Sequence, residues 1–387
     1  MAEWKTVRLG TIASTNQETY SPKENWQFVN YLDTGNITMN RIDEVQHINT
    51  SMDKLPSRAR RKVKSNSIIY STVRPNQLHY GIIKEQPENF LVSTGFTVID
   101  VNMEKAVPDY IYYVLTQKEI TEHLQAIAEQ SVSAYPSLKP SDIENLEVLL
   151  PDIDTQKATV AILGVIDEKI KQNTEINNNL SDLLQAIYQK QFDDVSLGAN
   201  QGILSDICSY SKEKVAVSEL NVNTYFSTEN MLPEKAGSTK ATSLPTTPQT
   251  TACRNGDTLI SNIRPYFKKI VYCEDMCGCS TDVLCFTPVQ AQYAAYLFST
   301  LYTDKFFAFM VAGSKGTKMP RGDKQQIMTY PVVLPAESEL EEFNAIAFPV
   351  LEQLNSNKAE NKRLSALRDA LLPKLMSGEI DISSIDL

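Results

Sequence analysis

The sequence predicts an α+β protein in which two similar mixed α/β domains are separated by two long helices that pair as an antiparallel coiled coil, with an internal pseudo-twofold repeat. Segments in the first half of the 387-residue chain recur in the second half. Two stretches carry apolar residues at helical spacing over many turns, and short apolar runs bounded by turn residues precede each of them.

Composition and charge narrow the class of protein. With 42% hydrophobic and 22% charged residues, the chain has the composition of a globular domain, and no apolar run reaches the length of a membrane span, roughly 20 residues. All six cysteines lie in the second half, which fits a reducing compartment, and the first residues lack the apolar core of a signal peptide. We therefore expect a cytoplasmic protein.

The strands and turns of the two halves match in the same order. The offset between matched residues falls from 195 near the start of each copy to 184, and then stays constant. Loops tolerate deletions, whereas a helix that keeps its register against a partner does not. The variable parts are therefore domains and the constant parts are helices. Matched pairs include Leu9 with Leu204, Tyr31 with Tyr225, Ser71 with Ser261, Arg74 with Arg264, Pro136 with Pro320 and Ile143 with Ile327.

This pattern divides the chain into four segments. We predict a first mixed α/β domain at residues 1–150, spacer helix 1 at 151–197, a second mixed α/β domain at 198–335, and spacer helix 2 with the C-terminal tail at 336–387. Within the domains, residues 109–130 and 291–313 alternate apolar and polar side chains at helical spacing. We therefore expect each domain to hold at least one helix packed on its sheet.

The two spacer helices are predicted at about 156–192 and 338–377, each roughly 55 to 60 Å long at 1.5 Å per residue. Pro349 and Pro373 should kink the second helix or end it. We call the line of residues along which the two helices face each other the helix seam. Asn173, Asn177 and their repeats occupy seam positions, where a polar residue is tolerated if it specifies register or partner. The alternative is that these asparagines are exposed. The residues predicted to pair the helices are Ile170, Asn173, Asn177, Leu180, Leu184, Leu354, Asn357, Asn361 and Leu364.

An antiparallel pair of helices with a domain at each end would hold two similar domains at a fixed distance. DNA is a ligand for which such spacing matters, since accessible stretches of one groove recur about every 34 Å. The net charge of −10 argues mildly against nucleic acid, but the basic residues cluster at 58–64, 264–269 and 315–324. These clusters predict contacts to DNA phosphates and bases, with solvated loop charges as the alternative.

Nearly the whole chain resembles the specificity subunit of type I restriction-modification enzymes. The segment LRDALLPKLMSGEI at 367–380 is similar to the end of the second spacer in that family, and residues 146–170 are similar to the start of the first. The chain departs from the family at 331–343, which lacks the Glu-Gln pair that usually follows the proline; Gln156 retains part of that pattern in the first copy.

The resemblance implies a non-catalytic subunit that binds double-stranded DNA, two methyltransferase subunits and restriction/translocase subunits. It places S-adenosylmethionine, ATP and magnesium in those partners and none of them in this chain. The residues agree, because no methyltransferase motif is present and GSKGTK at 313–318 fails the spacing of a phosphate-binding loop. We predict no metal site, since the spacing of Cys273, Cys277, Cys279 and Cys285 lacks a Cys-x2-Cys knuckle.

The residues predicted to contact DNA are cations and amides on the basic segments and on the repeated Arg-Pro turn. The repeated arginines have a structural alternative, a local ion pair within the fold. The set comprises Arg58, Arg60, Arg61, Lys62, Arg74 and Asn76 in the first domain, and Arg264, Tyr266, Lys268, Lys315, Lys318 and Arg321 in the second.

The predicted function is sequence-specific reading of a bipartite DNA site, one half by each domain, with the helices setting the gap and docking the methyltransferase subunits. Three alternatives remain open from the sequence. They are a stand-alone enzyme, a coiled-coil adaptor without a role on DNA, and the DNA-recognition subunit of another restriction class whose partner fuses nuclease and methyltransferase.

Overall fold

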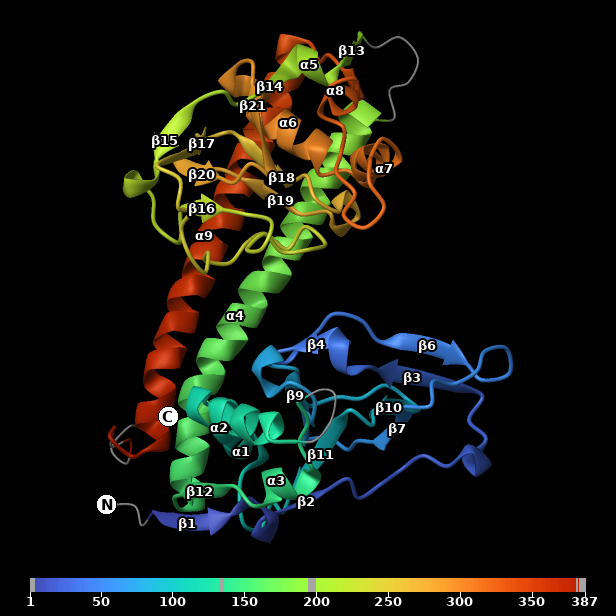
Figure 1. Cartoon of the computed structure of the whole chain (residues 1–387), viewed down its shortest axis with the longest axis vertical. Helices are drawn as coiled ribbons and strands as arrows, with labels where there is room; N and C mark the ends of the chain where they lie inside the picture. The colour runs from blue at the N-terminus through green and yellow to red at the C-terminus, as the bar shows by residue number, and fades with distance from the viewer. Residues whose placement is uncertain (1–3, 132–135, 194–199, 381, 383–387) are drawn as a thin grey trace. The chain divides into compact units, whose positions relative to one another are not determined.

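The computed structural model describes residues 4–131, 136–193, 200–380 and 382, and the chain forms two compact units. The first unit comprises Met1–Lys171 and Asn361–Leu387, and the second comprises Gln172–Glu360. Two long helices, α4 (Ile153–Tyr188) and α9 (Glu337–Met376), each contribute one half to each unit (Figure 1). The predicted fold class, two mixed-sheet domains with two long paired helices, is confirmed. The boundaries of the four predicted segments stay a prediction.

The described residues of the first unit form two four-stranded sheets. One sheet is antiparallel and has at its centre β8, whose five residues are all buried. Its order is β2 (Ala13–Thr15), β11 (Phe96–Val101), β8 (Ser67–Ser71) and β9 (Tyr80–Ile83). The other sheet is β6 (Gln46–Asn49), β3 (Phe28–Leu32), β10 (Phe90–Ser93) and β7 (Ala59–Lys62), with β3 and β10 parallel. Two-stranded ladders join β1 (Lys5–Arg8) to β12 (Glu147–Leu150) and β4 (Ile37–Thr38) to β5 (Arg41–Ile42).

The described residues of the second unit again form two four-stranded sheets. The antiparallel sheet is β14 (Cys208–Tyr210), β21 (Val283–Pro288), β18 (Thr258–Ser261) and β19 (Ile270–Tyr272). The mixed sheet is β15 (Lys214–Ala216), β17 (Gln249–Cys253), β20 (Cys277–Cys279) and β16 (Tyr225–Phe226), with β16 and β20 parallel. β13 (Gln201–Ile203) pairs with β22 (Pro331–Val333).

The two units repeat the same strand pairing. The order β2-β11-β8-β9 in the first corresponds to β14-β21-β18-β19 in the second, and β7-β10-β3 corresponds to β17-β20-β16. Even the register is kept, because Ser71 faces Phe96 in one unit and Ser261 faces Val283 in the other. The mixed sheets differ in their fourth strand, β6 beside β3 and β15 beside β17. The internal repeat read from the sequence is therefore a repeat of topology.

Each stretch with helical spacing inside a domain forms two helices. Residues 109–130 form α1 (Pro108–Leu115) and α2 (Lys118–Glu129), and residues 291–313 form α6 (Ala294–Leu301) and α7 (Asp304–Ala312). The prediction of at least one helix in each domain is therefore confirmed. In the second unit the cause of the break is Thr303, whose extended backbone stops α6 while its hydroxyl accepts a hydrogen bond from the Phe306 amide at 3.2 Å and caps α7.

Short helical segments complete the chain. The α-helical ones are α3 (Pro140–Glu144), α5 (Leu204–Ile207) and α8 (Lys324–Ile327), and a π-helical segment, Gln189–Asp193, follows α4. The 3-10 segments are Leu9–Thr11, Pro22–Glu24, Thr34–Asn36, Pro75–Gln77, Val217–Glu219, Pro265–Phe267 and Ala291–Tyr293.

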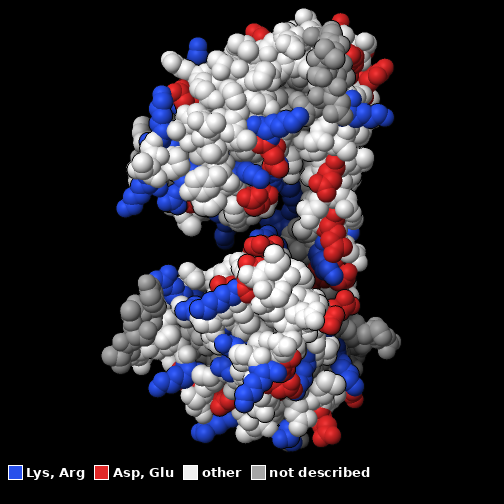
Figure 2. Space-filling view, turned by 90° about the vertical axis from the view of Figure 1, so that its right-hand side faces the viewer, with Lys and Arg blue, Asp and Glu red and all other residues white. Residues whose placement is uncertain are grey.

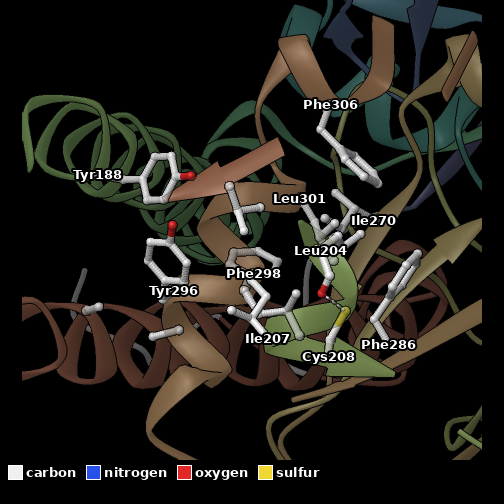
Figure 3. Close-up of a cluster of buried hydrophobic side chains, with 14 of the residues drawn as sticks. Tyr188, Leu204, Ile207, Cys208, Ile270, Phe286, Tyr296, Phe298, Leu301 and Phe306 are labelled. Atoms are coloured by element: carbon white, nitrogen blue, oxygen red, sulfur yellow. Dashed lines mark hydrogen bonds between the residues drawn. The ribbon is translucent and has the colours of Figure 1, made fainter. Parts of the chain in front are cut away.

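The long helices supply side chains to the core of each unit. In the second unit, the rings of Tyr188 from α4 and Tyr296 from α6 lie 5.6 Å apart, and the Tyr296 hydroxyl points toward Tyr188 (Figure 3). The Tyr188 hydroxyl donates to Thr300 Oγ1 at 3.0 Å. In the first unit, Leu163 of α4 and Leu375 of α9 belong to the same buried cluster. Burial of such side chains contributes roughly 1.5 to 3 kcal/mol each, so the helices are part of each unit's core.

Neither proline ends the second long helix. α9 runs from Glu337 to Met376 through Pro349 and Pro373. Pro349 is exposed, so the backbone carbonyl that loses its helical donor can turn to water, and Pro373 lies in the last turn. No helix within the described ranges is sufficiently long and apolar to cross a bilayer.

Candidate nucleic-acid interface and helix seam

The first unit presents a tight turn between β8 and β9. Arg74 precedes the 3-10 segment Pro75–Gln77 with a left-handed backbone, φ 49° and ψ 70°, and Leu78 follows it with φ 58°. A left-handed backbone costs a residue with a side chain roughly 1 to 2 kcal/mol. The Arg74 amide is held by a hydrogen bond to the Pro136 carbonyl at 3.1 Å. The fold therefore fixes this turn and leaves the side chains of Arg74 and Asn76 exposed.

The second unit repeats the turn with different side chains. Arg264 has φ 50° and ψ 63°, Lys268 has φ 51°, and Pro265–Phe267 form the 3-10 segment between them. The Arg264 amide donates to the Pro320 carbonyl at 2.8 Å. Arg264 is half-buried, whereas Tyr266 is 46% exposed. The two turns share a backbone but offer different groups to a ligand, with Asn76 in one and Tyr266 in the other.

The structure brings the predicted basic loop of the second domain to this turn. Lys315 and Arg321 exchange two backbone hydrogen bonds of 2.9 Å, which close the loop that carries Lys318. Ile263, next to Arg264, forms an isolated bridge with Arg321. The loop residues and the Arg-Pro turn therefore belong to one surface of the second unit. Residues 132–135 of the first domain, which match part of this loop in the repeat, lie outside the described residues.

The basic segment of the first domain lies on a sheet edge. β7 holds Arg60, Arg61 and Lys62, and Arg58 lies just before it. Arg58 is exposed, whereas the other three are half-buried. Burial lowers the pKa of the Arg61 guanidinium. The backbone of Arg61 bridges to Thr19, so the outer edge of β7 is partly covered and this segment is more enclosed than the sequence suggests.

Several predicted DNA contacts are already paired with acids. Hydrogen bonding to Asp304 raises the pKa of the Lys268 ammonium, and hydrogen bonding to Lys315 lowers the pKa of the Asp323 carboxyl. Such exposed pairs contribute roughly 0 to 1 kcal/mol, so a phosphate can compete for the cation. Arg58, Arg60 and Lys318 make no ion pair with another described residue. The pairs are Lys62–Glu24 (2.5 Å), Lys268–Asp304 (3.2 Å), Lys315–Asp323 (2.5 Å) and Arg321–Asp282 (3.0 Å).

The basic residues do not form one uniform patch on the face drawn in Figure 2. Lysines and arginines are scattered over both units there, and aspartates and glutamates lie among them. An electrostatic contact to DNA on this face would therefore depend on individual loops.

Sequence reasoning missed an aromatic residue beside the basic segment. The Lys62 ammonium lies 5.2 Å from the centre of the Trp26 ring. Both residues line a hollow of about 310 Å³ together with Glu18, Gln86 and Phe90. Trp26 lies far from Lys62 in the sequence, so no local pattern could have connected them.

Equivalent hydrogen bonds occur in the helix seam of both units. In the second unit, the Asn177 side-chain amide donates to the Leu354 carbonyl at 3.2 Å. In the first unit, the Asn361 side-chain amide donates to the Ile170 carbonyl, also at 3.2 Å. The sequence repeat relates donor to donor and acceptor to acceptor, each 184 residues apart. The pseudo-twofold relation therefore extends to single atoms.

Further contacts of the seam run in antiparallel order. In the second unit, Asn357 donates to the Asn177 side-chain oxygen at 2.9 Å, and Asn173 donates to the Glu360 carboxylate at 2.7 Å. Asn173 is 1% exposed and Asn357 is 6% exposed, so these amides are buried in the seam. Of the other residues predicted to pair the helices, Leu184 and Leu354 are buried, whereas Ile170, Leu180, Asn361 and Leu364 are half-buried.

An ion pair of the first unit also lies in the seam. Nη1 of Arg368 on α9 lies 3.0 Å from Oδ1 of Asp167 on α4. Burial alone would lower the pKa of Arg368, but the Asp167 carboxylate outweighs it and raises the pKa. The Tyr113 hydroxyl donates to Oδ2 of the same carboxylate at 2.7 Å. Asp167 was not among the residues predicted to pair the helices.

The cysteines lie in the core of the second unit. All six are buried thiols, and Cys273 and Cys277 have their sulfurs 3.5 Å apart. The Cys285 thiol donates to Asp257 at 3.2 Å, and burial raises the pKa of that carboxyl. Among the described residues, no group of three or more histidines, cysteines, aspartates or glutamates has the arrangement of a metal site.

Comparison with known proteins points in one direction. The family described as "Type I restriction modification DNA specificity domain" matches residues 1–182. The chain is 29% identical over 219 residues to the specificity subunit of the type I restriction enzyme HindI of Haemophilus influenzae, an alignment that covers 56% of this chain and 47% of that protein. The chain thus spans about half the length of that relative.

Two more distant proteins align over most of the chain. The type I restriction enzyme MjaIX specificity subunit of Methanocaldococcus jannaschii is 20% identical over 318 residues, 75% of this chain and 73% of that protein. A crystal structure of a type I restriction-modification S subunit from M. genitalium covers 97% of this chain and 96% of its own, with a TM-score of 0.57 and 16% identity. The latter likeness is one of fold.

Proposed function

Because the chain belongs to the type I restriction-modification DNA specificity family, we propose that it is the subunit that selects the DNA sequence on which such a complex acts. Each domain reads one half of an asymmetric, bipartite site in double-stranded DNA. The observation that carries this proposal is the repeated turn, in which one backbone presents Arg74 and Asn76 in the first unit but Arg264 and Tyr266 in the second. Turns with the same backbone but different side chains suit the reading of two different half-sites.

The long helices set the gap between the half-sites in this proposal. Their seam is antiparallel in each unit and is held in register by side-chain amides of asparagines. A register fixed by polar side chains resists slippage, which a spacer requires.

The same helices carry two equivalent positions for partner subunits. Leu183 on α4 and Leu367 on α9 are related by the repeat and are 50% and 49% exposed. Because the repeat gives each long helix one such position, the chain offers two equivalent places for two methyltransferase subunits. Restriction/translocase subunits join through those partners.

The chemistry resides in the partners. They supply S-adenosylmethionine-dependent methylation and the ATP- and magnesium-dependent steps of translocation and cleavage, whereas this chain recognises DNA and contributes no catalytic residue. We place the complex in the cytoplasm, where it meets DNA.

The experiment that tests this proposal exchanges one domain. Residues 198–335 are replaced by the corresponding domain of a relative, and the methylated motif of the host genome is read with each version of the protein. One half of the motif should change while the other half stays the same. A change in both halves, or no methylation that depends on this protein, would count against the proposal.

A further inference from the structure

A layer of the helix seam is the set of side chains from α4 and α9 that lie at the same level of one unit. One such layer is charged in the first unit and apolar in the second. In the first unit it contains the ion pair Asp167–Arg368, whose side chains are 34% and 21% exposed. The residues related to them by the repeat are Leu351 and Leu184. These leucines are 3% and 1% exposed in the core of the second unit. The same layer therefore holds opposite charges in one unit and two leucines in the other.

The neighbouring layer differs in size. Four residues before Asp167 and four after Arg368 lie Leu163 and Leu372, both in the core of the first unit. Their repeats are Ala347 and Tyr188, both buried in the core of the second unit. Two medium side chains fill this layer in one unit, and one small and one large side chain fill it in the other. Each arrangement fits its own unit.

The repeat makes a second pairing possible, in which each long helix pairs with the same helix of a second chain. The two layers described above would destabilise that pairing. Because the repeat relates α4 to α9 and the two helices pair in antiparallel orientation, α4 of one chain can form a similar antiparallel seam with α4 of a second chain. The hydrogen bonds of Asn177 and Asn361 do not oppose it, since Asn177 of one copy could donate to Ile170 of another as Asn361 does within the chain. The bond from Asn173 to Glu360 would be lost between two α4 helices, because the residue that matches Glu360 in α4 is Ile176. Preference for pairing within one chain must come from layers in which the residue on α4 differs from its counterpart on α9.

Pairing of like helices would disrupt the charged layer. Asp167 would face Leu184 of the second chain, and Arg368 would face Leu351. Arg368 keeps its contact with the adjacent Asp369, 2.9 Å away on the same helix. The cost therefore falls mainly on Asp167, a partly buried carboxylate that loses its cation.

Pairing of like helices would also disrupt the layer of unequal sizes. Two α4 helices would set Leu163 against Tyr188, which crowds the seam. Two α9 helices would set Ala347 against Leu372, which leaves a cavity. Both overpacking and cavities destabilise a close-packed core.

We propose that the Asp167–Arg368 pair, supported by the Leu163–Leu372 layer, selects pairing of α4 with α9 of the same chain over pairing of each helix with its counterpart in a second chain. Each long helix therefore pairs with the other long helix of its own chain. The consequence for DNA rests on the proposed function, because only pairing within one chain combines two different reading domains. The selection itself requires no DNA.

The test measures assembly of the full chain. Two versions with different affinity tags are mixed at equal concentration, unfolded in urea and refolded together. Sedimentation equilibrium then gives the mass, and purification on one tag shows whether the other tag follows. The wild-type protein should be monomeric and should carry no second tag.

Two variants should release the selection. In D167L/R368L neither pairing leaves a charge without its partner, and the association constant for dimers should rise at least tenfold, about 1.4 kcal/mol. In Arg368→Leu the Asp167 carboxylate lacks a cation in both pairings, so discrimination by charge is lost although the fold is less stable. The matched control is D167R/R368D, which forms its ion pair only within one chain and should stay monomeric.

The outcomes separate the possibilities. The proposal is overturned if both variants remain as monomeric as the wild type, or if the charge-reversed control dimerises as readily as D167L/R368L. Circular dichroism establishes that each variant has folded, and if D167L/R368L does not fold, Arg368→Leu decides the question. A wild-type monomer that fails to direct methylation would argue against the proposed function and leave the selection intact.

Discussion

Asn177 and Asn361 make the same hydrogen bond in different units, each to a main-chain oxygen of the opposite long helix and each at 3.2 Å. The bond joins a side chain to a carbonyl, so the acceptor does not depend on the identity of the opposing residue. It can fix the register of the seam in both units even though the surrounding side chains differ.

Replacement of Asn177 by alanine should lower the free energy of unfolding by about 1 to 3 kcal/mol, because it removes the bond to Leu354 and leaves the buried Asn357 amide without its acceptor. Urea denaturation followed by circular dichroism measures the change. Asn178→Ala is the matched control, since this neighbour is exposed on the same helix. Equal losses for both variants would show that the bond does not stabilise the seam.

The repeated turns should each affect one half of the DNA site. Arg74→Ala should weaken binding by about 1 to 3 kcal/mol, and the loss should fall on the first half-site. Titrations with DNA altered in one half or the other form a double-mutant cycle with this variant, and Arg264→Ala should couple to the opposite half. Arg8→Ala, at an exposed arginine outside the predicted set, serves as the control. Coupling of both variants to the same half would contradict separate reading.

The loop of the second domain offers a comparison between Lys318, which makes no ion pair with another residue that the structure describes, and Lys315, which does. Lys318→Met should lower the slope of log K against log salt concentration by about 1, as expected for the loss of one phosphate contact. Lys315→Met should change it less, because Lys315 already pairs with Asp323 at 2.5 Å. Fluorescence anisotropy at several salt concentrations gives both slopes. The opposite order would mean that the ion pair opens on binding.

The second domain should lose stability in acid through Asp304. Hydrogen bonding to Lys235 and Lys268 holds the pKa of this carboxyl below its ordinary value. A depressed pKa contributes stability above the unfolded value, about 4, and that contribution is lost as the pH falls through the folded value.

Asp304→Asn should therefore have a lower Tm than the wild type at pH 6, and the difference should shrink toward pH 3. Differential scanning calorimetry across that range measures it, with Asp53→Asn as the control at an exposed aspartate of the first unit. A difference that stays constant with pH would exclude the linkage to this carboxyl.

Lengthening both long helices together should widen the gap in the DNA site. Seven residues inserted after Lys171 and seven after Glu360 add two turns to each side of the seam, about 10 Å at 1.5 Å per residue. The methylated motif should keep both halves and gain roughly three base pairs between them at 3.4 Å per step. An unchanged gap would mean that the helices do not set the spacing.

The sequence predicted the repeat, the two long helices and the two-domain α+β fold. The offset between matched residues of the two copies is constant over the helices and falls over the domains. The sequence alone shows this, because a paired helix must keep its length whereas a surface loop tolerates deletions. The extents of α4 and α9 agree with the predicted stretches to within a few residues at most ends. Helical periodicity alone did not show the break at Thr303, because a single capping hydroxyl decides it.

Only the tertiary structure decided which charges are already paired. Arg368 and Asp167 are 201 residues apart in the chain and 3.0 Å apart in space. Lys62 and Glu24 are 38 residues apart in the chain, and Arg321 and Asp282 are 39 apart, yet each pair is in contact. Local patterns record which face of a helix or strand is apolar, and so they determine the elements and their order. An ion pair depends on the distance between two side-chain tips, which is fixed only when separate elements pack together, and for that reason the DNA contacts stay a prediction.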